Sequence, residues 1–185
     1  MEALNFYILY FLLMVMLNQA LFEIAESITY CVRPKESSQC LFDDCHNQPC
    51  KSWSYYAHYI DELINQQTNI TIIFMNGIHE AWYPVNIVSP AITIVGESQK
   101  ATVQGSNSFA INFENNIQVT IKSITFENIY ISVSPSKPLG IIHVQFESVN
   151  LIYSTLFAYI EGNADLLMKF ILCKFYNGAS LFGDI

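Results

Sequence analysis

The chain has 185 residues, of which 52% are hydrophobic and 13% are charged, and its formal net charge is −8. This composition excludes a disordered chain, because enough apolar surface is present to build a core. It also excludes nucleic acid as a partner, because phosphate binding requires clustered Lys and Arg, and the 8 basic residues are scattered. We expect one domain preceded by a targeting segment and no cofactor.

The N-terminal segment is predicted to direct export. An apolar run from Phe6 to Leu17 is followed by small residues, a pattern typical of a secretory signal peptide covering residues 1–27. The alternative is a membrane anchor from Leu4 to Phe22, which is close to the minimum length of a span. The sequence therefore predicts a secreted, extracellular protein, with membrane anchoring as the alternative.

Residues 28–51 form a cysteine-rich lead-in. In an exported chain, closely spaced cysteines favour disulfides, and we predict two of them without choosing among the three pairings. A zinc site including His46 is the alternative, but no tight C-x-x-C pair supports it. Cys173 is not among the disulfide candidates and is predicted to be a buried small hydrophobic residue. The disulfide candidates are Cys31, Cys40, Cys45 and Cys50.

An amphipathic helix is predicted over residues 52–68. Ser52 can cap it, and Trp53, Tyr56, Ile60 and Leu63 follow at helical spacing. We expect this helix to cap one end of the fold; a sugar-stacking platform made of its tyrosines is the alternative. Immediately after it, Asn69-Ile70-Thr71 is an N-glycosylation sequon, which predicts a glycan on a surface loop at Asn69.

A repeat organises the rest of the chain. Three copies share the pattern apolar-x-apolar-x-x-apolar-x-apolar. They begin at Val119, Val144 and Met168, so the period is 144 − 119 = 25 and then 168 − 144 = 24 residues. A period in this range indicates a solenoid. Alternating apolar residues predict strands, and the two-residue gap in each copy predicts a corner. The inward ladder consists of Val119, Ile121, Ile124, Phe126, Val144, Phe146, Val149, Leu151, Met168, Phe170, Cys173 and Phe175.

We therefore predict an all-β fold over residues 69–185: a right-handed parallel β-helix of four to five coils, each of 20–25 residues. The rival is a leucine-rich repeat, which requires a helix or 3₁₀ turn after each strand and usually Asn or Cys at the turn. The turn position carries Ile124, Val149 and Cys173, and residues 129–142 are rich in β-branched residues and proline. Such a segment forms a poor helix, which favours the β-helix.

Several motifs resemble a known family. They are Tyr30-Cys31-Val32-Arg33-Pro34, Pro49-Cys50 with a tyrosine-rich helix, Phe74-x-x-Gly77-x-His79, Val85-Asn86-Ile87 and Ile92-Thr93-Ile94-Val95-Gly96-Glu97. Together they are similar to right-handed parallel β-helix (pectate-lyase-like) ectodomains of large secreted or membrane-tethered proteins of simple marine animals. The resemblance covers roughly residues 30–127 and implies no catalytic residue. The sequence departs from it in a cysteine-containing insertion around Cys45-His46 and in its early end.

The outward positions of the repeat contain no predicted catalytic site. Hydrolases of β-helix type require paired carboxylates, and lyases require carboxylates that hold a cation beside a basic residue. No outward column of the repeat stacks two acids, and Lys122 with Glu147 is predicted to form an exposed ion pair. The histidines are interpreted as structural or exposed. We predict that the chain is not an enzyme and binds no metal.

The predicted function is extracellular binding or adhesion, with a glycan or a protein as the partner. The alternatives are a polysaccharide lyase or hydrolase and a purely structural spacer. The last five residues, 181–185, are mainly apolar, so the β-helix is expected to be truncated or to self-associate through an uncapped C-terminal coil.

Overall fold

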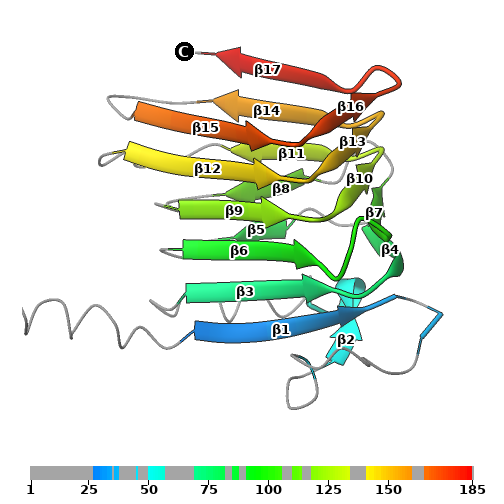
Figure 1. The fold of residues 1–185 in the computed structure, drawn as a ribbon. Coiled ribbons are helices and arrows are strands. Elements are labelled where there is room, and N and C mark those ends of the chain that lie inside the picture. Colours follow the sequence, from blue (N-terminus) through cyan, green and yellow to red (C-terminus); the bar gives the residue numbers. More distant parts are fainter. Residues whose placement is uncertain are drawn as a thin grey trace, which may run out of the picture.

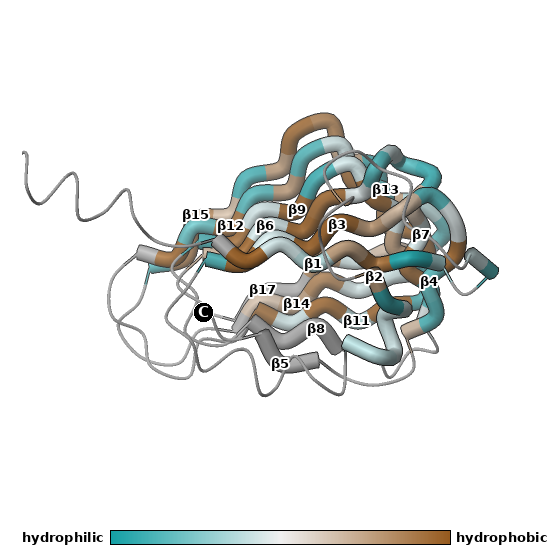
Figure 2. Tube along the Cα trace, turned by 90° about the horizontal axis from the view of Figure 1, so that it is seen from below, coloured by the Kyte–Doolittle hydropathy of each residue, from teal (hydrophilic) through white to brown (hydrophobic). Residues whose placement is uncertain are grey.

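The computed structural model describes residues 27–34, 36–37, 45, 50–56, 69–81, 85–87, 91–105, 110–113, 118–133, 141–159 and 165–184. These residues form an all-β parallel solenoid with almost no helix. Strands of three sheets lie above one another along the stack (Figure 1). Viewed along the stack, two of the sheets lie opposite each other and the third joins them at one side (Figure 2).

Sheet A is the longest of the three, and all of its strand pairs are parallel. Its seven strands, in spatial order, are β15 (Asp165–Ile171), β12 (Ile141–Glu147), β9 (Gln118–Lys122), β6 (Ala91–Gly96), β3 (Asn69–Phe74), β1 (Ser27–Arg33) and β2 (Cys50–Ser52).

Sheets B and C each contain five parallel strands and complete the turns. Sheet B consists of β16 (Lys174–Tyr176), β13 (Asn150–Ile152), β10 (Thr125–Glu127), β7 (Ala101–Gly105) and β4 (Gly77–Ala81). Sheet C consists of β17 (Ser180–Asp184), β14 (Thr155–Tyr159), β11 (Tyr130–Val133), β8 (Ala110–Phe113) and β5 (Val85–Ile87). The chain runs from sheet A to B to C and then returns to A.

The core is a set of inward columns in which apolar side chains of successive coils lie one above another. Val119, Val144 and Met168 are register partners in sheet A, as the 25- and 24-residue spacings of the repeat predict. All eight ladder residues of the first two copies are buried, whereas the four of the third copy are partly or largely exposed. Each coil therefore buries its interior against its neighbours, so stability is summed along the stack.

From β9 onward, each corner between sheets A and B and between sheets B and C contains a residue in the left-handed region. Between sheets A and B these residues are Ser123, Ser148 and Leu172, with φ of 51°, 55° and 54°. Between sheets B and C they are Asn128, Tyr153 and Asn177, with φ of 53°, 49° and 51°.

These corners keep the backbone hydrogen bonds between coils continuous. The amide of Ser123 donates to the carbonyl oxygen of Glu147 at 2.9 Å, and the amide of Asn150 donates to that of Ile124 at 3.0 Å. The corner predicted by the two-residue gap at Lys122-Ser123 thus turns at one left-handed residue, Ser123, and it does not interrupt the backbone hydrogen bonds between coils. The N–H of Ser123 and the C=O of Ile124 therefore each retain a partner at the corner.

The coil count differs from the predicted four to five coils of 20–25 residues. About three turns, β9–β17, are regular, with register partners 24 or 25 residues apart. The strands β3–β8 follow the same order with uneven spacing: Ile70 pairs with Ile92 (92 − 70 = 22) and Ile92 with Val119 (119 − 92 = 27). Connections of unequal length in this part of the chain account for the difference.

The N-terminal end of the stack is covered by β1, β2 and the aromatic residues that follow them. Trp53 packs against Phe74, with ring centroids 5.1 Å apart, and Tyr30 packs edge-on against Tyr56 at 5.5 Å. Residues 53–56 are helical, but the rest of the predicted helix over residues 52–68 lies outside the described residues. A cap helix of that length is therefore not confirmed, whereas aromatic packing on the first coil is present.

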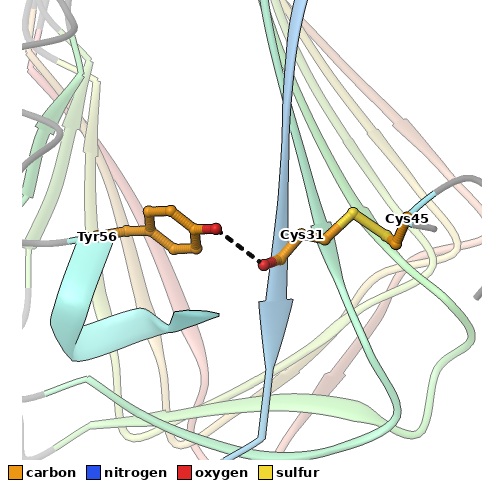
Figure 3. Close-up of a disulfide and its surroundings, with 3 residues drawn as sticks. All are labelled: Cys31, Cys45 and Tyr56. Carbon is orange, nitrogen blue, oxygen red and sulfur yellow. Dashed lines mark hydrogen bonds between the residues drawn. A yellow bond between two sulfur atoms is a disulfide. The ribbon is translucent and has the colours of Figure 1, made fainter. Parts of the chain in front are cut away.

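A disulfide between Cys31 and Cys45 fastens the lead-in to the outer side of sheet A, where it packs with Ile73 and Met75. The hydroxyl of Tyr56 donates to the carbonyl oxygen of Cys31 at 3.2 Å, and it approaches β1 from the side opposite the disulfide (Figure 3). Burial raises the pKa of Tyr56 to about 12. The two contacts hold β1 from both sides.

The signal peptide or anchor predicted over residues 1–27 lies almost wholly outside the described residues. Within the ranges that the structure does describe, no helix has the length and hydropathy needed to cross a membrane.

Candidate functional site

The outward face of sheet A presents a column of hydrogen-bonding side chains. The register stacks Thr29, Thr71, Thr93, Thr120, Gln145 and Lys169 in six consecutive strands. Adjacent strands in a sheet are about 4.8 Å apart, so the column offers polar groups at an even spacing on a rigid surface. Thr120 is 9% exposed, so its hydroxyl lies deeper in the face than those of its neighbours in the column.

Beside this column, Lys122 and Glu147 form the ion pair that the sequence predicted. The distance from Lys122 Nζ to Glu147 Oε2 is 3.3 Å, and the two side chains are 42% and 39% exposed. Gln145 Nε2 also donates to Glu147 Oε2, at 3.4 Å. An exposed pair of this kind contributes little to stability, because water screens it.

Sheet B carries a second outward column that contains two acids. Glu80 pairs in register with Gln104, and Gln104 pairs with Glu127, so the two carboxylates belong to the same column two strands apart. In the neighbouring column, Asn150 Nδ2 donates to Thr125 Oγ1 at 3.2 Å, and Thr125 Oγ1 donates to the carbonyl of Gln99 at 2.9 Å. The part of the sheet B face around Thr125 is thus polar and internally hydrogen-bonded.

Sheet C carries aromatic rings on its outward face. The rings of Tyr130 on β11 and Phe157 on β14 are stacked, with centroids 6.0 Å apart and an interplanar angle of 26°. Both side chains are partly exposed, whereas the alternate residues Ile131 and Leu156 are buried. On β14 and β17, the hydroxyls of Thr155 and Ser180 lie 3.3 Å apart. This face combines ring surface with hydroxyl groups.

His79 has a structural role in the inward column of sheet B. Its register partner is Val103, it is 1% exposed, and its ring packs edge-on against Phe74 at 4.9 Å. Nε2 lies 2.7 Å from the carbonyl oxygen of Met75. Burial lowers the pKa of His79, and the backbone groups of Met75 and Arg33 oppose this effect. We interpret His79 as a core residue of the first coil.

The remaining predicted site residues lie apart from one another. Asn69 is the first residue of β3 and is partly exposed, so the sequon begins a strand instead of lying in a loop. Cys50 is disulfide-bonded as well, while Cys40 lies outside the described residues. His143 is exposed on the outward face of β12. Among the described residues, no group of three His, Cys, Asp or Glu side chains could hold a metal ion.

Two parts of these faces did not emerge from the sequence. The sequence did not show that the threonine column extends beyond Thr120 to Thr93, Thr71 and Thr29, because the uneven spacing of β1–β6 hides the register. The aromatic pair lies on the third strand of each coil, which the repeat pattern did not include. The alternation in Tyr130-Ile131-Ser132-Val133, matched 25 residues later by Thr155-Leu156-Phe157-Ala158, is the signal that could have identified it.

No family model matches the chain, and no curated protein and no solved structure is similar to it.

Proposed function

We propose that this chain is an extracellular β-solenoid module for binding or adhesion, with a glycan or a protein as its partner. We further propose that the solenoid is right-handed and of the pectate-lyase-like class. The observation that carries the binding proposal is the outward threonine column of sheet A, which repeats hydrogen-bonding groups at the spacing of the strands. A partner with a regular repeat can bind such a surface without reorganising it.

Export is supported by the disulfide between Cys31 and Cys45, because disulfides persist in oxidising compartments. The proposed signal peptide over residues 1–27 and a glycan at Asn69 agree with that location. The direct test is expression of the full chain in secreting cells. Protein in the medium with an N-glycan that an endoglycosidase removes supports secretion, and retention in the membrane fraction supports the anchor.

Binding is tested by passing the secreted protein over immobilised polysaccharides and cell-surface protein fractions. We expect retention on at least one surface and no change in the bound polymer. A Thr71→Ala, Thr93→Ala double variant should lower retention if the partner lies along sheet A. A protein that binds nothing would leave only the spacer role.

A second candidate function, glycoside hydrolysis, is favoured by one observation. Glu80 and Glu127 share a column two strands apart, a backbone separation of roughly 9.6 Å from the strand spacing. Inverting enzymes hold their paired carboxyl groups about 6.5–9.5 Å apart, a distance that the two side chains would reach only by leaning toward each other. New reducing ends that disappear in a Glu127→Gln variant would establish hydrolysis and overturn the binding-only function.

A further inference from the structure

We propose that the outward face of sheet C around Tyr130 and Phe157 is a binding site for a neutral glycan chain. This inference rests on the proposed binding function and goes beyond it, because it names a second surface, on sheet C instead of sheet A, and a chemical class of ligand. The site, called here the ring face, consists of Tyr130, Ser132, Thr155, Phe157 and Ser180.

The position of the two rings supports this site. Tyr130 and Phe157 occupy alternate positions opposite the buried Ile131 and Leu156, so they lie on the outside of the solenoid. The outward face of a sheet is normally polar, because apolar surface left in water lowers stability. Both side chains are nevertheless partly exposed, so part of their apolar surface faces solvent, where it suits a ligand that is itself partly apolar. The C–H face of a sugar ring is such a ligand.

Hydroxyl side chains lie on the strands adjacent to the two rings. Ser132 is the register partner of Phe157, and Thr155 is the register partner of Tyr130. Each ring is therefore paired with a hydroxyl side chain on the adjacent strand. A hydroxyl group can both donate and accept a hydrogen bond, which suits the hydroxyl groups of a sugar. An aromatic ring can contact the apolar C–H face of a sugar, and the adjacent hydroxyls can hydrogen-bond its hydroxyl groups.

The charge of the ring face and of the whole chain favours a neutral ligand over an acidic one. None of the described side chains on the ring face is charged. The formal net charge of the whole chain is −8, so an acidic polymer would be repelled at long range. An acidic glycan requires basic groups for recognition, and the face provides none among its described residues. A neutral chain running across the coils can place successive sugars over Tyr130 and Phe157.

The experiment measures retention of the full secreted chain on insoluble cellulose, chitin and β-1,3-glucan. Tyr130→Leu and Phe157→Leu remove the ring faces but keep apolar side chains that pack on the sheet. Tyr153→Leu is the matched control: it makes the same change at a tyrosine that is 56% exposed and lies at the corner before β14, outside the residues of the ring face. Thermal unfolding of each variant verifies that it is folded, and a Phe157→Tyr variant retains a ring.

We expect the wild type to bind one of these polymers. We expect Tyr130→Leu and Phe157→Leu each to weaken binding by about tenfold or more, while Tyr153→Leu and Phe157→Tyr bind as the wild type does. If the Leu variants bind as tightly as the wild type, the assignment of the glycan site to the ring face is overturned and the proposed function stays intact. Binding only to an acidic polymer or a protein would likewise overturn this inference alone. Failure to bind any partner would overturn both.

Discussion

Gly96 lies so close to the carbonyl oxygen of Ser123 that a Cβ at this position would meet that oxygen at 2.1 Å. Ser123 is the corner residue of the next coil, so the contact joins the end of β6 to the corner after β9. The absence of a side chain at Gly96 allows the two coils to stack at this corner.

We predict that Gly96→Ala destabilises the fold by about 1–3 kcal/mol, because the corner at Ser123 must move to admit a methyl group. Urea unfolding measures the change. The control is Gly178→Asn, where no atom lies within 4 Å of an added Cβ and φ is +79°, a conformation that Asn tolerates. A Gly96→Ala variant as stable as the wild type would show that the corner is not closely packed.

The corner residue Leu172 offers a stabilising substitution. It has φ of 54° and is 78% exposed, while Asn128 and Asn177 occupy equivalent left-handed positions at other corners. Leu172→Asn is expected to raise the free energy of unfolding by about 0.5–1 kcal/mol, because Asn adopts this conformation at lower cost. Leu167→Asn makes the same change in strand β15 at 56% exposure and should give no gain. An equal gain from both would assign the effect to lost surface hydrophobicity.

The burial of His79 is expected to make the free energy of unfolding depend on pH. Burial lowers its folded-state pKa below the ordinary value of 6.5, so the unfolded chain binds a proton more readily than the folded chain. Stability contributed by neutral His79 is fully present above pH 6.5 and is lost as pH falls below that value toward the folded-state pKa. Unfolding measured between pH 7.5 and 5.5 should show this decrease.

The His79 effect has a specific variant and control. His79→Gln keeps a donor for the carbonyl of Met75 without a titrating group, and it should flatten the pH dependence in this range. His143→Gln, at an exposed position on β12, should leave the wild-type dependence unchanged. If both variants behave alike, the decrease originates from other groups.

Phe175 provides a test of self-association. It is 43% exposed, whereas its column partners Leu151 and Phe126 are fully buried. We predict concentration-dependent association of the chain through the last described coil, measured by sedimentation velocity. Phe175→Lys should abolish it, because a charge on the inward column opposes burial. Tyr176→Lys, also 43% exposed but on the outward face, should not. A wild type that stays monomeric at every concentration would contradict the prediction.

The sequence predicted the regular part of the fold because identical columns repeat at nearly constant spacing. Val119, Val144 and Met168 could be aligned from their spacing alone, and so could the corner after Lys122. The position of His79 could not be predicted. Its corner contains extra residues: seven positions separate Ile72 from His79, but five separate Ile121 from Phe126, although both pairs occupy the same two inward columns.

The site was less accessible to sequence reasoning than the fold. The outward columns of β9, β12 and β15 followed from the repeat, but the threonine column required the pairing of β1 with β3. That pairing joins Thr29 to Thr71 across the cysteine-rich lead-in, and no local periodicity indicates it. The ring face depends on a third strand whose pattern is only four residues long in β11. Short alternating segments do not fix a register unless their neighbours are known.

The short corners between the sheets restrict where the chain can change its length. From β9 onward, two or three residues separate the strands of sheets A and B and those of sheets B and C, whereas the return from C to A spans residues 134–140 after β11 and 160–164 after β14. Insertions at Ser123 or Asn128 would break the hydrogen bonds between coils. The number of residues between β11 and β12 already differs from that between β14 and β15, so we expect added segments, such as a tag or a new recognition loop, to be tolerated there without a change of register in the stack.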